Sequence, residues 1–110
     1  MTLTRLKGIG IGNSKGSGRV LIISSHQDFA KVKGNEVLVV QNATPDFIVI
    51  LKKVKCLITD QGGATSHIAI VCRELSIHAI IATGLATAKF HNNDEIYFDT
   101  TKGTVTRYDP

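Results

Sequence analysis

The sequence predicts a small domain of the mixed α/β class. Three observations support this class: short apolar runs rich in β-branched residues recur along the chain, helical patterns separate several of these runs, and the C-terminal part has a strand–turn–strand pattern. The chain has 110 residues, of which 43% are hydrophobic. We therefore expect one domain over residues 1–110 that buries about two thirds of its unfolded surface around a core.

Continuous apolar runs between polar turns predict four buried strands: Val20–Ile23, Val37–Val40, Cys56–Thr59 and His78–Thr83. A closing hairpin is predicted to follow, turning at Lys102 and Gly103 between the strands Glu95–Asp99 and Thr104–Tyr108. The first eighteen residues contain five glycines, a density typical of tight loops and of close backbone packing. Their spacing fits neither a phosphate loop nor a dinucleotide-binding fingerprint, so we interpret this segment as structural.

A first helix is predicted over about 45–53. Thr44 is a helix-capping residue, Pro45 follows at the first helical position, and Asp46 lies in the first turn, where the helix dipole favours an anion. The buried face of this helix is predicted to carry Phe47, Ile50 and Leu51.

A second helix is predicted over residues 68–75, because apolar side chains recur there at the i, i+3, i+4 and i+7 positions. These side chains are Ile68, Val71, Cys72 and Leu75. Arg73 and Glu74 are expected to face outward, and we interpret Arg73 as making an outward salt bridge or a partner contact.

Composition excludes several classes of function. The net charge is +4, but the basic residues flank apolar segments without forming long runs, so we expect no nucleic-acid partner. No apolar run approaches the roughly 18 residues of a membrane span, and the first residues lack a signal-peptide core, so we expect a cytoplasmic protein without a membrane partner. Cys56 and Cys72 lack CxxC spacing and are expected to be free buried thiols, with no metal site.

The segment DQGGATSH, which starts at residue 60, separates the third predicted strand from the second predicted helix. It places His67 in the first helical turn, where backbone amides have no helical partners and the helix dipole is positive. Gly62 and Gly63 allow a bulky anion to approach the backbone closely. Either Thr65 or Ser66 can cap the helix, and the other hydroxyl is then free to bond the imidazole or a phosphate.

His67 is the candidate reactive residue. The positive end of the dipole favours a neutral, nucleophilic imidazole and then stabilises a phosphoryl group attached to it. From the residues alone, three chemical roles are open: phosphate binding, general base and nucleophile. A lone histidine here would more simply cap the helix or fill space. The string GGATSH, followed by an apolar helix, is more specific than any single residue and favours a chemical role.

The stretch from Asp60 to Leu75, continued by SIHAIIATG, resembles the phosphohistidine, or swivelling, domain of the PEP-utilising enzymes. That family includes PEP synthase, pyruvate phosphate dikinase and enzyme I of the sugar phosphotransferase system. The similarity extends to GNEVLV from Gly34, to TPD from Thr44 and to the final hairpin. It implies a compact β/β/α swivelling fold in which His67 is the phosphorylated nucleophile. It also implies that the hydroxyls of Thr65 and Ser66 and the backbone of Gly62 and Gly63 serve the phosphoryl group.

The resemblance implies partners as well. In this family an ATP-grasp domain or a PEP- or pyruvate-binding TIM barrel loads and unloads the carrier histidine. The chain is too short to contain either, so we expect it to bind no cofactor alone, with Mg²⁺ and ATP or PEP held by a partner domain or subunit. The alternative is a non-catalytic regulatory or protein-binding module that retains the fold.

Some residues depart from the family pattern or carry a simpler interpretation. His78 stands where the family usually has proline, and Cys72 replaces a common alanine. His26 and His91 lie in polar, turn-like contexts and are interpreted as solvated turn residues.

Overall fold

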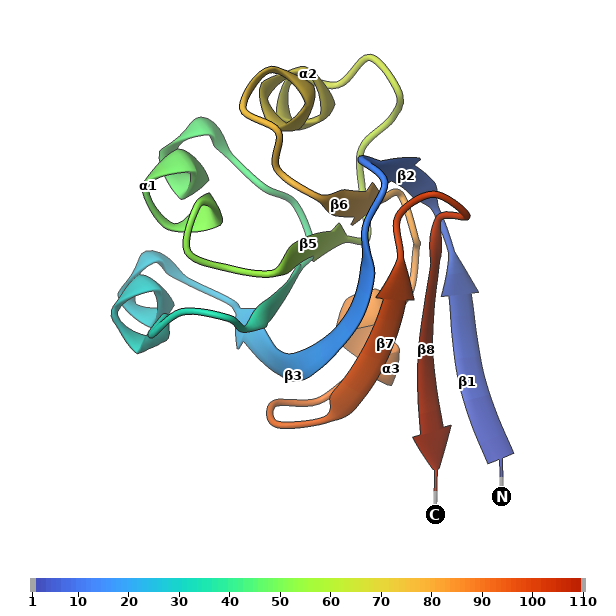
Figure 1. The fold of residues 1–110 in the computed structure, drawn as a ribbon. Coiled ribbons are helices and arrows are strands. Elements are labelled where there is room, and N and C mark those ends of the chain that lie inside the picture. Colours follow the sequence, from blue (N-terminus) through green and yellow to red (C-terminus); the bar gives the residue numbers. More distant parts are fainter. Residues whose placement is uncertain (1, 110) are drawn as a thin grey trace.

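The computed structural model describes residues 2–109. Eight strands form one strongly curved sheet with helices packed around it (Figure 1). The strands are β1 (Thr2–Lys7), β2 (Ile9–Ile11), β3 (Lys15–Ile23), β4 (Val37–Val40), β5 (Cys56–Thr59), β6 (Ala79–Ile81), β7 (Glu95–Asp99) and β8 (Thr104–Asp109). The helices are η1 (His26–Lys31) and η2 (Pro45–Phe47), both 3-10, and α1 (Ile48–Leu51), α2 (His67–Glu74) and α3 (Ala86–Lys89). No helix within residues 2–109 has the length and apolar character needed to span a membrane.

The two outer strands of the sheet are neighbours in the chain. The strand order is β1-β8-β7-β3-β4-β5-β6-β2, so β1 and β2 lie at opposite edges, and yet Gly8 alone separates them in sequence. The sheet must therefore curl until its edges meet, and it forms a nearly closed, barrel-like structure. The start of β1 and the end of β8 are paired and lie side by side (Figure 1).

Strand β3 joins an antiparallel part of the sheet to a parallel part. Residues Lys15–Arg19 pair antiparallel with β7, and residues Val20–Ile23 pair parallel with β4. Strands β5 and β6 continue the parallel part. The connections between the parallel strands carry η1, α1 and α2, which lie on the outer side of this part of the sheet (Figure 1).

Two apolar cores lie on the two faces of the parallel strands. Successive residues of a strand point to opposite faces. In β4, Val37 and Val39 therefore enter the core inside the barrel, whereas Leu38 and Val40 enter the core beneath the helices. Burial on both faces explains why the predicted strands are continuously apolar. The resulting layers confirm the predicted mixed α/β class and the β/β/α arrangement implied by the resemblance.

Three glycines allow two parts of the backbone to cross in direct contact. Gly8 and Gly10 lie at the connection from β1 to β2, and Gly103 lies in the turn of the β7–β8 hairpin. The amide of Gly8 donates to the carbonyl oxygen of Gly103 at 2.8 Å. A Cβ atom at Gly10 would overlap the carbonyl oxygen of Thr100, and one at Gly103 would overlap that of Gly8. Gly103 also has a φ of +71°, which residues other than glycine rarely adopt. Larger side chains at this crossing would prevent the two edges from meeting.

The N-terminal segment corrects part of the sequence interpretation. The glycine-rich residues form mainly β1, β2 and the start of β3. The predicted tight loop is limited to residues 12–14 between β2 and β3, where Gly12 has a φ of +97°, and close backbone packing is confirmed at Gly8 and Gly10. The strands pair with β8, β6 and β7, which lie roughly 70 to 105 residues away along the chain. A local sequence pattern gives no information on strand partners that are so distant in the chain. Glycine is also unfavourable in most strands, so these residues were not predicted as strands.

The predicted helix over about 45–53 is shorter in the structure, where η2 and α1 end at Leu51. The hydroxyl of Thr44 does not cap the helix, because it donates to the carboxylate of Asp46 instead. The predicted apolar face is confirmed, since Phe47, Ile50 and Leu51 are buried.

The other predicted elements agree apart from their ends. The strand predicted over His78–Thr83 is limited to β6, and Ala82 beyond it has a φ of +62°, which is incompatible with an extended strand. The second helix begins at His67, which confirms the predicted place of this residue in the first helical turn, and Leu75 beyond its end is 39% exposed rather than part of the core. Neither η1 nor α3 was predicted.

We predict that Gly10→Ala destabilises the protein by about 3 kcal/mol or more, because the new methyl group has no space beside the Thr100 carbonyl. Urea unfolding followed by circular dichroism measures this loss. The control is Gly63→Ala: no atom lies within 4 Å of a Cβ at that position, so its stability should remain within about 0.5 kcal/mol of the unsubstituted chain. Equal stabilities for the two variants would contradict the backbone crossing.

A carboxylate holds the start of η1. Asp28 Oδ2 accepts the amides of Ser24 and Ser25 at 2.8 and 3.2 Å, and Oδ1 pairs with Lys31 Nζ at 2.9 Å. The hydrogen bond from Lys31, followed by those from the two serine amides, lowers the pKa of Asp28 from its ordinary 3.8 to about 2. Ionised Asp28 therefore stabilises the turn that follows β3.

This lowered pKa predicts a pH-dependent contribution to stability. A carboxyl group whose pKa is lowered on folding stabilises the protein above its unfolded pKa and loses that effect as the pH falls through the folded value. We expect Asp28→Asn to be less stable than the unsubstituted chain at pH 6, and we expect the difference to shrink between about pH 4 and pH 2. Urea midpoints across this range test it. A difference that is independent of pH would contradict the role of the charge.

Candidate functional site

The loop that contains the GGATS string runs from the end of β5 to the start of α2. It therefore lies at the carboxyl ends of the parallel strands, the edge at which open α/β sheets usually bind ligands. The β4–β5 pairing continues into its first residues, because the amides of Asp60 and Gln61 donate to the carbonyls of Val40 and Gln41 at 3.1 and 3.0 Å. The loop thus leaves the sheet in a fixed direction.

The buried side chain of Thr59 anchors the first part of the loop. Its hydroxyl donates to the carbonyl oxygen of Gln61 at 2.6 Å and accepts the amide of Ala82 at 3.3 Å. The Thr59 carbonyl accepts both the amide and the hydroxyl of Thr83, at 3.0 and 2.9 Å. Thr59 is fully buried and its bonds are partly buried, so they hold the loop against the segment that follows β6.

Asp60 provides a second anchor. Its carboxylate accepts the amide of Thr87 at 3.0 Å and also the hydroxyl of the same residue, while its carbonyl accepts the amide of Gly84 at 3.0 Å. The loop is thereby joined to the start of α3. The sequence interpretation did not assign this role, because Thr87 is 27 residues away and no local spacing connects the two side chains.

The structure separates the roles of the two hydroxyl residues that precede His67. Ser66 is the N-cap of α2: its Oγ accepts the amide of Ala69 at 3.3 Å and donates to the carbonyl of Gly63 at 2.8 Å. The side chain of Thr65 is exposed and makes no hydrogen bond to other residues within the range 2–109. Of the two alternatives that the sequence left open, Ser66 is thus the cap and Thr65 retains a free hydroxyl.

His67 is the first residue of α2 and is exposed. Its imidazole forms no hydrogen bond or ion pair with any residue of the described range 2–109. The cap supplies an acceptor for the Ala69 amide but none for the amides of His67 and Ile68, which are unpaired first-turn donors. Gly63 has open space around its α-carbon. An anion thus has room, backbone donors and a positive helix end beside a free imidazole.

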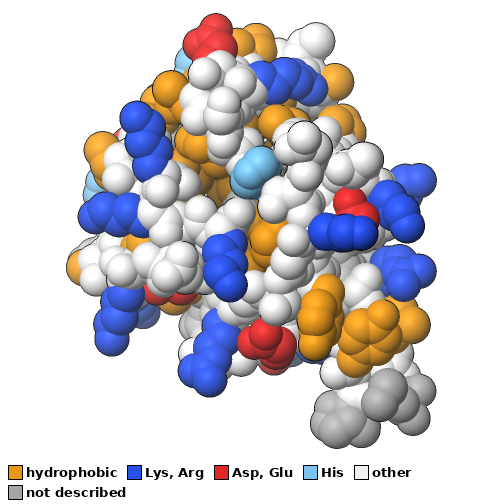
Figure 2. Space-filling view, in the orientation of Figure 1, with side chains coloured by type: hydrophobic (Ala, Val, Ile, Leu, Met, Phe, Trp, Pro, Cys, Tyr) orange, Lys and Arg blue, Asp and Glu red, His pale blue; other side chains and the backbone are white. Residues whose placement is uncertain are grey.

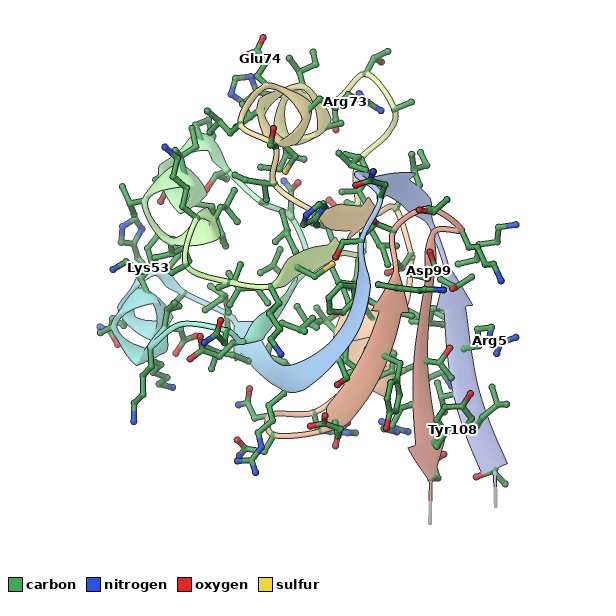
Figure 3. The ribbon with its side chains drawn as sticks, viewed as in Figure 1. Arg5, Lys53, Arg73, Glu74, Asp99 and Tyr108 are labelled. Atoms are coloured by element: carbon green, nitrogen blue, oxygen red, sulfur yellow. The ribbon has the colours of Figure 1, made fainter. Side chains whose placement is uncertain are left out.

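Arg73 points back to the loop rather than outward. Its Nη1 donates to the carbonyl oxygen of Ala64 at 2.6 Å. Figure 3 shows its side chain directed from α2 toward the loop, whereas the neighbouring Glu74 points away from it. Arg73 forms no salt bridge within residues 2–109, so that part of the prediction is wrong, whereas the alternative of a partner contact stays a prediction. Its partner is a backbone carbonyl, which no pattern of charged residues in the sequence reveals.

His78 is partly buried at the other end of α2. Its Nδ1 is buried without a hydrogen-bond partner in residues 2–109, and a Cβ atom at Gly12 would overlap it. The His78 carbonyl nevertheless accepts the amide of Leu57 at 3.0 Å. The imidazole in place of the family's usual proline therefore leaves β5–β6 pairing intact at this point.

The remaining histidines lie in exposed structures. His26 begins η1 and is not in a simple turn; its Nδ1 lies 2.8 Å from Asp46 Oδ2. His26 and Asp46 both line a cavity of about 500 Å³, and His67 does not belong to that lining. His91 occupies a turn, as predicted, and its amide donates to the carboxylate of Asp94 at 2.8 Å.

Both cysteines are free and buried, as predicted. Burial raises the pKa of Cys72 to about 11 and raises that of Cys56 further, so neither thiol is an activated nucleophile. Within residues 2–109, no three His, Cys, Asp or Glu side chains are grouped so that they could hold a metal ion. Lysine and arginine side chains are spread over the face shown in Figure 2 and do not gather into one patch.

Solved structures share this fold. The NMR structure of the Enzyme I (nEIt) protein matches with a TM-score of 0.60 and 32% identity, over 70% of this chain and 32% of that chain. Aconitase X from Thermococcus kodakaraensis matches with a TM-score of 0.68 over 96% of this chain and 99% of that chain. Its identity is 15%, so that likeness concerns the fold alone.

Sequence relatives are more specific. A probable phosphoenolpyruvate synthase from Pyrococcus horikoshii is 43% identical over 91% of this chain, and the phosphoenolpyruvate synthase from Pyrococcus furiosus is 39% identical over the same share. The phosphoenolpyruvate synthase from Deinococcus radiodurans is 34% identical over 89% of this chain. The chain spans only 12 to 13% of the length of these relatives.

The family model described as "PEP-utilising enzyme, mobile domain" matches residues 32–103, which include the loop, α2 and the C-terminal hairpin up to its turn. This match covers more than half of the chain, and the relatives in the preceding paragraph agree with it. The chain therefore belongs to the PEP-utilising enzyme family, and it corresponds to the mobile domain of that family.

Proposed function

We propose that the protein is a phosphoryl carrier that is transiently phosphorylated on His67. The observation that carries this proposal is the free, exposed imidazole at the first turn of α2, beside unpaired amides and a loop whose two ends are anchored. A structural histidine would be expected to pack or to pair, and this one does neither within the described residues. The kinship with phosphoenolpyruvate synthases supports phosphoryl chemistry.

In the proposed step, an unprotonated ring nitrogen of His67 attacks the phosphorus atom of the donor. The new N–P bond forms as the bond between phosphorus and the leaving oxygen breaks, and that oxygen keeps the electron pair. In this proposal the hydroxyl of Thr65 and the backbone at Gly62 and Gly63 bind the phosphoryl oxygens, which the exposure of Thr65 and the open space at Gly63 support. Ser66 contributes indirectly, because its hydroxyl already caps the helix. In a second transfer, an oxygen of an acceptor such as pyruvate attacks the phosphorus atom, and the N–P bond breaks with its electron pair returning to the ring nitrogen of His67.

The donor and the acceptor would be bound elsewhere. Since the chain spans 12% of its phosphoenolpyruvate synthase relative, we infer that it works with an ATP-grasp or PEP/pyruvate-binding TIM-barrel domain or subunit in the cytoplasm. Mg²⁺ with ATP or PEP would belong to those partners, and this chain would bind no cofactor by itself. The exposure of His67 supports this division, because an exposed nucleophile can enter a partner's site.

The second candidate is a non-catalytic regulatory or protein-binding module with the same fold. It requires no reactive histidine, so it leaves the combination of a free imidazole, a free Thr65 hydroxyl and the open Gly63 without a purpose. The two candidates differ in one measurable property, which is whether the chain takes up a phosphoryl group at His67.

We predict that His67→Ala abolishes phosphorylation and leaves the fold intact, because the side chain is exposed and unpaired. The chain is incubated with Mg²⁺ and either PEP or ATP, together with Pyrococcus furiosus phosphoenolpyruvate synthase lacking its own mobile domain. Phosphorus NMR and intact mass then detect an acid-labile, base-stable phosphate. The control is His26→Ala, which removes another exposed histidine and should keep the label. A labelled His67→Ala chain would refute the assignment.

A second prediction distinguishes the role of the Ser66 hydroxyl from that of the Thr65 hydroxyl. Ser66→Ala removes the helix cap and should lower the free energy of unfolding by about 1 kcal/mol. Thr65→Ala should change stability by less than about 0.5 kcal/mol and slow labelling of His67 roughly tenfold or more, because a donor to the phosphoryl oxygens is lost. Urea unfolding and the labelling rate are measured on both variants. The reverse pattern, with Thr65→Ala the less stable chain, contradicts these roles.

A further inference from the structure

We propose that Arg73 is a positioning residue that holds the loop before His67 in the conformation that accepts the phosphoryl group. This inference rests on the proposed carrier function and adds to it a residue that touches neither the reacting nitrogen nor the phosphoryl group. The juxtaposition that carries it is the 2.6 Å hydrogen bond between Arg73 Nη1 and the carbonyl oxygen of Ala64.

The loop is held firmly at its ends and weakly in its middle. Thr59 and Asp60 fix its start through partly buried bonds, and Ser66 fixes its end through the cap. Between them, Gly62 is exposed with a φ of +127°, and nothing lies within 4 Å of a Cβ at Gly63. Two consecutive glycines have large conformational freedom. The middle of the loop therefore needs a contact from outside if it is to keep one conformation.

Two hydrogen bonds connect this middle part to the rest of the site. Ser66 closes a turn onto the Gly63 carbonyl, through both its amide and its hydroxyl. Arg73 bonds the next carbonyl, that of Ala64. The Ser66 bonds act within the loop itself. Only the Arg73 bond, among those made by residues 2–109 to Ala64 and Thr65, joins the loop to the second turn of α2.

An arginine is suited to this position. Side chains on a helix incline toward its N-terminus, so a long side chain at Arg73 reaches back along α2 to the loop that precedes it. A charged donor makes a stronger hydrogen bond to a carbonyl than a neutral one does. The planar guanidinium also retains further N–H groups and keeps its positive charge, which favours an anion near the loop.

An alternative role for Arg73 is direct contact with a partner protein, since the side chain is exposed. Glu74 provides a matched control, because it is adjacent, exposed and charged but points away from the loop (Figure 3). A small phosphoryl donor distinguishes the two roles of Arg73, because phosphorylation by such a donor requires a correctly positioned loop but no partner protein. Phosphoramidate phosphorylates histidine directly: its P–N bond breaks, ammonia leaves, and the phosphoryl group bonds to the ring nitrogen without a partner protein.

The first measurement concerns the loop alone. Amide hydrogen exchange is followed by NMR in the unphosphorylated 110-residue chain, with the Ser66 amide as reporter because it bonds the Gly63 carbonyl at 3.1 Å. Arg73→Ala should increase exchange of the Ser66 amide roughly tenfold, which corresponds to about 1.4 kcal/mol of lost local stability. Arg73→Lys should restore part of the protection, and Glu74→Ala should match the unsubstituted chain. Unchanged exchange in Arg73→Ala overturns the proposal.

The second measurement is the rate of phosphorylation by phosphoramidate, with His26 and His91 in the same molecule as internal references. Arg73→Ala should slow labelling of His67 by roughly tenfold and leave both references unchanged, with partial rescue by Arg73→Lys. Unchanged labelling of His67 overturns the positioning role, even if the loop is looser. If His67 in the unsubstituted chain is labelled no faster than His26 and His91, the carrier function fails, while exchange still decides whether Arg73 holds the loop.

Discussion

The architecture depends on a single short connection. Gly8 is the only residue between β1 and β2, which lie at opposite edges of an eight-stranded sheet. This constraint forces the sheet to curl, brings the Gly8–Gly10 backbone onto the β7–β8 turn at Gly103, and divides the interior into two cores. Helices α1 and α2 cover the outer side of the parallel strands, whereas Ala86 of α3 packs into the core on their inner side.

That arrangement determines where chemistry can occur. Helices α1 and α2 cover the outer face of the parallel strands. The loops that follow the carboxyl ends of these strands are therefore the part that remains exposed. The loop before α2 is fixed where it leaves the sheet by Thr59 and Asp60, and where it enters the helix by Ser66. His67 follows immediately, and its exposed imidazole makes no hydrogen bond or ion pair with the residues that the structure describes. A carrier benefits from this separation, because the reactive group can be modified without disturbing the core.

The sequence was sufficient to locate the site, but it did not identify all of the side chains that hold the loop in place. The string GGATSH after an apolar strand and before an amphipathic pattern was sufficient to place His67 in a first helical turn. It left the cap undecided between Thr65 and Ser66, since both hydroxyls have suitable spacing, and only the bond of Ser66 to Ala69 resolves the choice. The bonds of Asp60 to Thr87 and of Arg73 to Ala64 could not be foreseen, because one partner is distant in sequence and the other is a backbone carbonyl.

The same division holds for the fold. Strands β4 and β5, the hairpin of β7 and β8, and helix α2 were predictable from residue patterns, because each buries a continuous run or one periodic face. Strands β1 and β2 were not, since their glycine-rich sequence has low strand propensity and forms strands only against partners from the other end of the chain. Local sequence thus established the α/β class and the position of His67. Long-range backbone pairing established the barrel, the anchors of the loop and the backbone contact of Arg73.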